Sequence, residues 1–287
     1  MGEASFIYHK IVAAVRARPG IHPAMLRAVG LARSLAGEVT LVHAMEREET
    51  IAPAPDVVHQ RFKELKAIYP KITSISLETG SIWNVIVETA RKTHADLVAI
   101  STHMHSQFAA LVGTYSDQVL HHADRDVLVT RTERYTVDQV PENYRNILLA
   151  VDLQENHTTI AQRAIALAKN QGARLSLLHV VDHYPSLRDN DDVLREDVDP
   201  IAHQREVKGA RLAQFARDMG VGDATQEVVV TSDAAHHAIP AYAKAKGVDL
   251  VVIGAHKPTT MDWLLGSIAD NVVHHAPCDV LVVHIPS

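Results

Sequence analysis

The residues with the clearest binding chemistry follow two apolar, strand-like segments in the second half of the chain. Asp152 comes directly after the segment 145–151. Gly254 comes in the same way after the segment 248–253. A glycine at such a point lets the backbone approach a ligand closely, because it carries no side chain. A carboxylate nearby can fix the orientation of a polar ligand. The pattern predicts a binding site where these two segments end.

A Gly-Ser pair further along the chain adds chemistry suited to a phosphate. Gly266 and Ser267 stand at the expected start of the last helix, where free backbone amides and the helix dipole favour an anion. His256 and Lys257 lie in the loop between Gly254 and this pair. Lys257 can answer the charge of a phosphate, although a solvated loop lysine is the commoner case. The expected ligand is therefore a small phosphate-bearing molecule.

The second half of the chain repeats the first. The segment 8–15 recurs as 144–151. The segment 96–131 aligns without a gap with 249–284, and 16 of the 36 positions are identical. One register held over that length indicates an internal duplication, because unrelated segments drift out of register.

The duplication predicts two domains, at residues 1–132 and 144–287. The polar stretch from Thr132 to Asn143 has the composition of a linker. The second copy carries an insertion between His179 and Asp233, and its acidic stretch 185–192 is predicted to form a surface loop.

Each copy alternates short apolar runs with longer segments of helical periodicity. Continuous apolar runs are typical of parallel strands buried on both faces, and Gly37 and Gly172 are predicted to end the first helix of each copy. Strand–helix alternation with right-handed crossovers predicts an α/β fold with two tandem, doubly wound, five-stranded parallel sheets. The predicted strands are 10–15, 38–43, 72–77, 96–101 and 126–130, then 145–151, 173–181, 226–231, 248–253 and 278–284.

Length, charge and cysteine content narrow the class of protein. A chain of 287 residues suits two ordinary domains, and its net charge of −6 gives no general attraction to nucleic acid. No apolar stretch reaches the length of about 18 residues typical of a membrane-spanning helix, so no membrane insertion is expected. Cys278 is the only cysteine and the first residues do not resemble a signal peptide, which favours the cytoplasm.

The order of these features resembles two universal stress protein domains in tandem, the E-type arrangement, with a Rossmann-like fold. In nucleotide-binding members of that family an aspartate follows strand 1, and Asp152 matches it. Those members also carry a loop with Gly-x-x-Gly, nine residues, and then Gly-Ser or Gly-Thr; Gly254, Gly266 and Ser267 match it. The resemblance implies ATP or ADP in the second domain, with Val180 as a further contact. It also implies a pseudo-dimer through the last strands 127–129 and 280–282, with a further homodimer left open.

Departures from the family pattern make the two copies unequal. In the second copy Lys257 replaces the second glycine and the loop is one residue shorter, which is similar to A-type members that do not hold ATP firmly. The first copy departs further, and Arg16 there either binds an anion or, as we favour, plugs a dead pocket. We therefore expect one binding site beside a structural partner. The degenerate counterparts in the first copy are Arg16, Ser101, Gly113 and Thr114.

Nineteen histidines are the unusual feature of the composition. Zinc needs three or four converging ligands, and no single segment supplies them at a familiar spacing. His103 and His105 are the best seed for a metal site, but a metal is not expected. A surface that responds to pH is the alternative, because histidines titrate near neutrality.

No nucleophile, base and orienting group stand together in the sequence, so no catalytic residue is predicted. A stress-response regulator that binds its ligand is the favoured function. One alternative is weak ATP hydrolysis, in which Asp152 and His256 would polarise a water at the bound phosphate. The other is a ligand-free interaction scaffold, because both glycine loops depart from the family pattern.

Overall fold

The computed structural model describes most of the chain outside its loops. All structural statements below refer to these residues. The described ranges are 8–15, 22–45, 55–102, 115–131, 143–153, 158–182, 200–231, 234–255 and 266–285. The predicted linker and the acidic stretch 185–192 lie outside the described residues, apart from Asn143 at the end of the linker.

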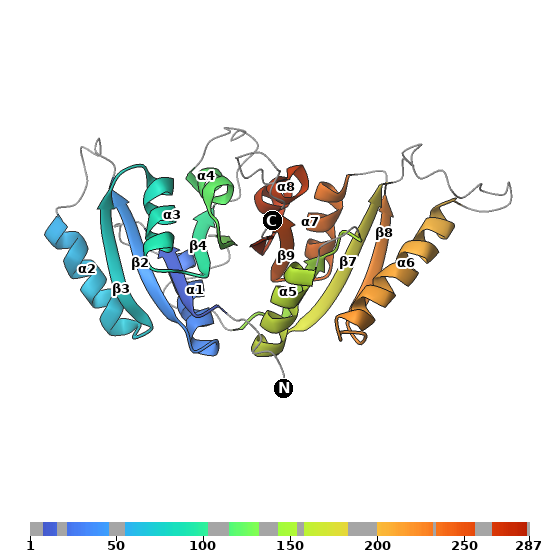
Figure 1. Cartoon of the computed structure of the whole chain (residues 1–287), viewed down its shortest axis with the longest axis horizontal. Coiled ribbons are helices and arrows are strands. Elements are labelled where there is room, and N and C mark those ends of the chain that lie inside the picture. Colours follow the sequence, from blue (N-terminus) through green and yellow to red (C-terminus); the bar gives the residue numbers. More distant parts are fainter. Residues whose placement is uncertain are drawn as a thin grey trace.

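All ten predicted strands are present, and their ends differ from the prediction by two residues or fewer. They form one sheet in the order β3-β2-β1-β4-β5-β10-β9-β6-β7-β8 (Figure 1). Within each half the neighbouring strands are parallel. The strands are β1 (Lys10–Ala14), β2 (Glu38–Met45), β3 (Ile72–Thr79), β4 (Leu97–Thr102), β5 (Asp126–Arg131), β6 (Asn146–Ala150), β7 (Arg174–Asp182), β8 (Thr225–Thr231), β9 (Leu250–Ala255) and β10 (Asp279–His284).

Helices cover both faces of the sheet, so each half is doubly wound as predicted. One buried core packs α1, α2, α5 and α6 against the sheet, and a second core on the other face packs α3, α4, α7 and α8. The helices are α1 (Pro23–Ser34), α2 (Pro55–Ile68), α3 (Ile82–Lys92), α4 (Tyr115–His122), α5 (Thr158–Gln171), α6 (Pro200–Asp218), α7 (Ala235–Ala245) and α8 (Ser267–His275). No helix among the described residues is long and apolar enough to cross a membrane.

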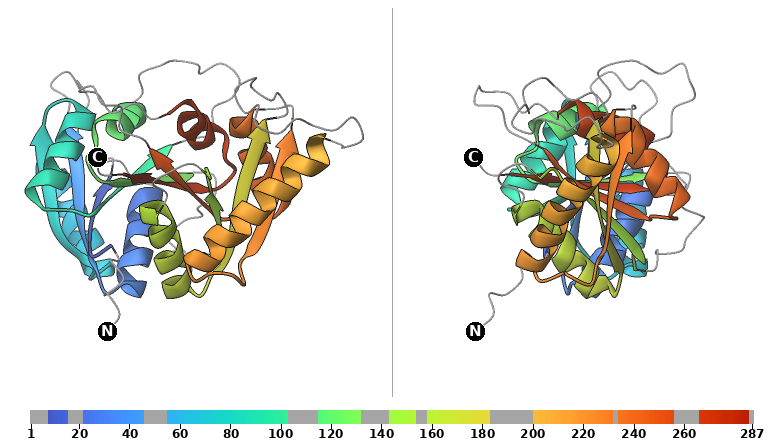
Figure 2. Two further views of the ribbon diagram at one scale, coloured as in Figure 1. Left: turned by 45° about the vertical axis from the view of Figure 1, so that its right-hand side comes forward. Right: turned by 90° about the vertical axis from the view of Figure 1, so that its right-hand side faces the viewer.

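The two halves meet through their last strands. β5 and β10 pair antiparallel, with Val129 opposite Val280 and Val127 opposite Val282. This is the contact between the segments 127–129 and 280–282 that the family resemblance implies, and it joins the two five-stranded sheets into one of ten strands. The first helices of the two halves also touch, because the Asn170 side-chain amide of α5 donates to the Ser34 carbonyl of α1 at 3.1 Å. Figure 2 shows these two helices side by side.

A buried carboxylate from each domain fixes this junction. Asp279 begins β10 and is fully buried. Its Oδ2 accepts from the Tyr144 hydroxyl at 3.0 Å and from Arg27 Nε of the other domain at 3.3 Å. Its Oδ1 accepts from the backbone N–H of Arg131, also of the other domain, at 3.1 Å. A buried charge is tolerated because it is paired and hydrogen-bonded in this way.

Asp126, at the start of β5, repeats the arrangement from the opposite side. It accepts from the Tyr8 hydroxyl at 2.6 Å within its own domain. From the second domain it accepts from Arg163 Nε at 3.1 Å and from the His284 backbone N–H at 2.9 Å. Burial raises the pKa of the Asp126 carboxyl, while these hydrogen bonds act against that rise. Each domain thus donates two hydrogen bonds to the buried aspartate of the other domain, one from an arginine side chain and one from a backbone N–H at the end of its last strand.

The two helix ends predicted from glycines turn out differently. Gly172 follows α5 with φ of 65°, the left-handed conformation that glycine favours, as predicted. After α1 the residue with the left-handed conformation is Ala36, with φ of 54°. The prediction that Gly37 ends this helix is therefore wrong. Gly37 is needed for a different reason, because a Cβ there would lie 2.8 Å from the His9 carbonyl oxygen.

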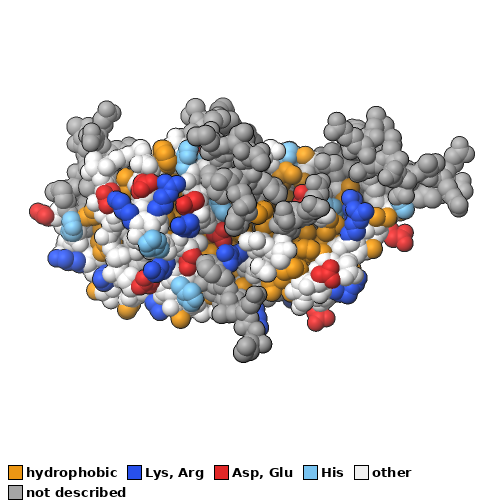
Figure 3. All heavy atoms as spheres, in the orientation of Figure 1, with side chains coloured by type: hydrophobic (Ala, Val, Ile, Leu, Met, Phe, Trp, Pro, Cys, Tyr) orange, Lys and Arg blue, Asp and Glu red, His pale blue; other side chains and the backbone are white. Residues whose placement is uncertain are grey.

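Charged side chains on the surface are interspersed by sign over the first domain, on the face drawn in Figure 3. Some form exposed pairs, such as Arg91 with Glu88 at 2.7 Å. Exposed pairs of this kind contribute little to stability, because water screens them. The buried pairs at the junction are therefore the ion pairs that matter for the assembly of the two domains.

Candidate functional site

Asp152 lies at the edge of the sheet predicted for ligand binding. It follows the end of β6 by two residues, and its side chain is exposed. β6 is flanked by β9 on one side and β7 on the other, both parallel to it. Strand order reverses between β6 and β9, and ligands of doubly wound sheets bind at the carboxyl ends of the strands at such a point.

The backbone that carries Asp152 is fixed to β7. The Val151 N–H donates to the Leu178 carbonyl at 2.8 Å. The Val151 carbonyl lies 2.8 Å from Nδ1 of His179, which must donate the proton because a carbonyl only accepts. Burial lowers the pKa of His179, and Lys208 of α6 adds to the effect, while the hydrogen bond to the Val151 carbonyl and the charge of Asp152 oppose it.

The first domain repeats this turn without the aspartate. Val15 N–H donates to Val42 O at 2.9 Å, and His43 Nδ1 lies 3.1 Å from Val15 O. Arg16, the residue that takes the place of the aspartate, lies outside the described residues. As far as Val15 and Val151, the backbone is therefore held in the same way in both copies.

Val180 lies on β7, beside this turn. The pairing of β6 with β7 ends at Ala150 and Leu178, so Val180 lies two residues beyond it. On its other side β7 continues to pair with β8, where Val180 is opposite Val229. Val180 is half-buried at the carboxyl end of β7, which places it at the same edge of the sheet as Asp152.

Gly254 is explained by packing rather than by an open approach to its backbone. A Cβ added at Gly254 would lie 2.2 Å from Ile160 Cδ1 and 3.1 Å from Ile160 Cγ1. Ile160 belongs to α5 and is only 3% exposed, so it has little room to move. The space above Gly254 is filled by this side chain.

The first domain holds the complementary pair of residues at the same two positions. Ser101 aligns with Gly254, and Ala24 aligns with Ile160. The Ser101 hydroxyl accepts from the Ala24 backbone N–H at 2.9 Å and lies 3.0 Å from Thr130 Oγ1. In the first domain a small helix residue, Ala24, is thus paired with the larger strand residue Ser101. In the second domain a large helix residue, Ile160, is paired with Gly254.

Gly266 and Ser267 lie at the start of α8, as predicted. Gly266 is the N-cap residue and Ser267 the first helical residue, and both are exposed. No side chain caps this helix end among the described residues. A Cβ at Gly266 would meet nothing within 4 Å among the described residues, and none of their side chains caps the first amides of α8.

Several predicted site residues cannot be placed relative to this edge. His256 and Lys257 of the second domain lie outside the described residues, and so do the counterparts Arg16, Gly113 and Thr114 and the metal candidates His103 and His105. The structure brings Asp152, Val180, Gly254 and the start of α8 to one edge of the second half of the sheet.

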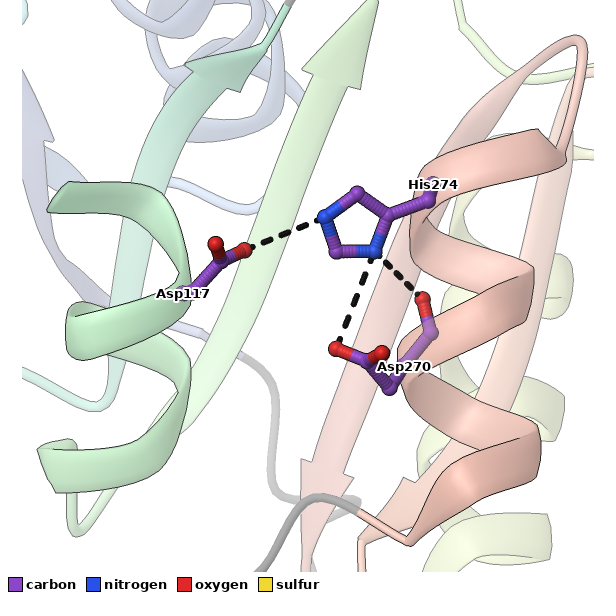
Figure 4. A group of neighbouring side chains, drawn as sticks. All are labelled: Asp117, Asp270 and His274. Atoms are coloured by element: carbon purple, nitrogen blue, oxygen red, sulfur yellow. Dashed lines mark hydrogen bonds and ion pairs between the residues drawn. The ribbon is translucent and has the colours of Figure 1, made fainter. Parts of the chain in front are cut away.

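A cluster that the sequence prediction missed joins the last helices of the two domains. His274 of α8 lies with Nε2 3.2 Å from Asp117 Oδ1 of α4, and its Nδ1 donates to the Asp270 carbonyl at 2.8 Å (Figure 4). Asp117 above all raises the pKa of His274, to about 9, so the ring is an imidazolium at neutral pH. The Asp-x-x-x-His spacing, which occurs in both copies, indicates the two Asp-His pairs but not that they meet across the junction.

A cavity of about 470 Å³ lies elsewhere, at the opposite edge of the sheet. Its lining includes His9, Lys10 and Glu38 at the amino ends of β1 and β2, together with Lys71 and Thr73. The carboxyl ends of the strands, where Asp152 and the start of α8 lie, are not part of its lining.

Strand order and the edge that carries Asp152 define a doubly wound α/β protein of the kind that binds ligands at the carboxyl ends of its strands. The sequence profile of the universal stress protein family matches residues 7–131 and again residues 143–284. The chain therefore belongs to the universal stress protein family and contains two of its domains in tandem.

Individual relatives agree with this assignment. Universal stress protein A homolog 2 of Coxiella burnetii is 33% identical over 146 residues, which cover 50% of this chain and 97% of the relative. Universal stress protein A homolog 1 of the same organism is 28% identical over 141 residues, covering 49% of this chain and 96% of the relative. Each relative thus corresponds to about one half of this chain.

Solved structures match the whole chain. A putative universal stress protein from Pseudomonas aeruginosa aligns with a TM-score of 0.72 and 18% identity, covering 98% of this chain and 95% of that one. A universal stress protein from Archaeoglobus fulgidus aligns with a TM-score of 0.61 and 17% identity, covering 95% and 98%. At such identities the likeness supports the fold alone.

Proposed function

We propose that this chain is a stress-response protein that binds a nucleotide or another phosphate-bearing small molecule in its second domain and acts as a regulator. The observation that supports the proposal is the position of Asp152 and of the uncapped start of α8. They belong to the segments that follow the neighbouring strands β6 and β9. A phosphate is suited to the uncapped amides at Gly266 and Ser267, and a polar group of the ligand to the Asp152 carboxylate.

ATP or ADP is the ligand we propose to test first. The chain offers an anion-binding helix start, a carboxylate and the polar backbone at the end of β7, which suit the phosphates, the ribose hydroxyls and the base of a nucleotide. His256 and Lys257 belong to the loop between β9 and α8, and Lys257 would contribute a positive charge to the phosphates. We assign no contact to Gly254, because Ile160 covers it.

The two domains are proposed to act as one unit, a dimer built into a single chain. The pairing of β5 with β10 and the buried aspartates Asp126 and Asp279 support this, because each aspartate is bonded by the other domain. In this unit the second domain binds the ligand and the first serves as its structural partner. We place the protein in the cytoplasm, where a lone buried cysteine such as Cys278 would remain reduced.

Native mass spectrometry of the freshly purified full chain tests this function. We expect a retained mass of nucleotide size, or binding of added ATP, that is lost in Gly266→Asp because the new carboxylate occupies the anion site. Gly113→Asp, the counterpart in the first domain, is the matched control and should leave binding unchanged. If the wild-type chain neither retains a ligand nor binds millimolar ATP, the proposal is wrong and an interaction scaffold takes its place.

A phosphate-release assay separates the regulator from a weak ATP hydrolase. The regulator predicts no release above a heat-killed control, for both the wild type and Asp152→Ala. Release by the wild type that Asp152→Ala abolishes would contradict the regulator and establish an enzyme.

A further inference from the structure

The last helix of each domain carries the same pair of metal-ligand residues. Asp117 and His121 lie one turn apart on α4, and Asp270 and His274 lie one turn apart on α8. Residues four positions apart lie on the same face of a helix. The duplication has therefore produced two Asp-His pairs, and the antiparallel pairing of β5 with β10 brings the helices that carry them together at the centre of the molecule (Figure 1).

Three of these side chains converge across the domain junction. One ligand atom each of Asp117, Asp270 and His274 lies within 4.8 Å of the other two. Ligands bound to a zinc ion at about 2.1 Å stand about 3.4 Å apart in a tetrahedral site. The separation of His274 Nε2 and Asp117 Oδ1, 3.2 Å, already fits that spacing. The Asp270 carboxylate, whose Oδ1 lies 3.7 Å from Nδ1 of His274, would have to turn toward Nε2 to complete the set.

The imidazole is oriented as a metal ligand would be. Nδ1 of His274 donates to the Asp270 carbonyl at 2.8 Å, which fixes the ring and points Nε2 toward Asp117 (Figure 4). In metal sites the second ring nitrogen of a ligating histidine commonly donates to a carbonyl in this way. The hydrogen bond thus selects Nε2 as the nitrogen available to a metal.

Partial burial and charge also favour a cation here. The side chains are 14% exposed for Asp117, 31% for His274 and 40% for Asp270, so an ion can enter while losing much of its contact with water. Two carboxylates held this close by two domains need a positive charge between them. A divalent ion bound between them would supply that charge.

We propose that Asp117, Asp270 and His274 bind one divalent transition-metal ion, best suited to Zn²⁺, which links the last helices of the two domains. One imidazole nitrogen and two carboxylate oxygens form a donor set that suits zinc better than Mg²⁺, which prefers oxygen ligands alone. Three protein ligands leave a fourth position for water. The site shares no residue with the proposed nucleotide site, so the two proposals are tested independently of each other.

Calorimetric titration of the chelator-treated full chain with Zn²⁺ tests the site. We expect one equivalent to bind with micromolar affinity or tighter, and to raise the melting temperature, because the ion binds only when both helices are in place. Asp270→Asn and His274→Gln should each weaken binding at least tenfold. Asp270→Asn keeps the contact between His274 and Asp117, so it tests the metal without breaking the junction. A circular dichroism spectrum checks that each variant is folded.

His275→Gln is the matched control. His275 is the next residue on α8, is exposed, and makes the same kind of bond, from Nδ1 to the Asn271 carbonyl at 2.8 Å. Its substitution should leave zinc binding unchanged. The proposal is overturned if the wild type binds no zinc, if neither ligand variant weakens binding, or if Mg²⁺ binds as tightly as Zn²⁺. The second result would assign the ion to other histidines, and the third to a nonspecific acidic surface.

Discussion

The exchange of residues between Gly254 and Ile160 in one domain and Ser101 and Ala24 in the other leads to a sharp prediction. Gly254→Ser places a Cβ 2.2 Å from Ile160 Cδ1 and 3.1 Å from its Cγ1. Rotation of the Cδ1 methyl cannot relieve the second contact, so the core must shift. Overpacking of this kind costs about 1–3 kcal/mol of unfolding free energy.

Ile160→Ala alone should cost about 2–5 kcal/mol, because it leaves a cavity beside the strand. The double variant reproduces the pair found in the first domain, where the Ser101 hydroxyl accepts from the Ala24 N–H at 2.9 Å. In it the serine fits, and its hydroxyl can bond the N–H of residue 160. We therefore expect the double variant to be more stable than the sum of the single effects predicts, by about 1–3 kcal/mol.

Urea unfolding followed by circular dichroism measures the four free energies of this cycle. Gly209→Ser is the matched control, because a Cβ at Gly209 would meet nothing within 4 Å. Because serine has a higher helix propensity than glycine, that change should stabilise the chain by a few tenths of a kcal/mol. Single effects at Gly254 and Ile160 that add to within about 0.5 kcal/mol would refute the packing argument. Gly254 would then be needed for another reason, such as contact with a ligand.

Two further predictions concern the junction and its response to pH. Arg163→Met should lower the unfolding free energy by about 3 kcal/mol, because it leaves the buried Asp126 carboxylate without its cation. Arg91→Met, on the exposed pair with Glu88, is the control and should cost less than about 1 kcal/mol in the same urea assay. Equal losses of unfolding free energy in the two variants would contradict the account. Burial lowers the pKa of His284 to about 4, so the unfolded chain binds a proton at this histidine more readily than the folded chain does. The contribution of His284 to the unfolding free energy is therefore fully present above pH 6.5 and is lost as the pH drops toward 4. Between pH 8 and pH 5 this histidine should account for about 2 kcal/mol of the loss, measured as the difference in pH dependence between the wild type and His284→Phe, and an identical pH dependence of the two would rule it out.

The repeat and the strand periodicity made most of the fold predictable. Both are set by local chemistry, because strands buried on both faces must be continuously apolar and a shared ancestor preserves their register. The contact between the last strands was implied by the family resemblance and not by the apolar pattern itself. The left-handed Ala36 in place of Gly37 was not predictable, because helix ends also depend on the tertiary space that Gly37 leaves for the His9 carbonyl.

The site was only partly predictable. The positions of Asp152 and of Gly266 follow from strand order, which the sequence carries. The role of Gly254 does not, because a glycine motif gives no information about the isoleucine that packs over it from another helix. The cluster of Asp117, Asp270 and His274 depends on which helices meet across the junction, and only the three-dimensional pairing of the domains reveals that.

The central claim is that one domain binds the ligand while the other supports it. Hydrogen–deuterium exchange of the full chain with and without ATP, resolved by peptide, tests this most directly. The account predicts slower exchange on ligand addition in the segment after β6 that contains Asp152 and at the start of α8, with peptides from the matching positions of the first domain unchanged. Equal protection in both domains, or protection confined to the first, would contradict it.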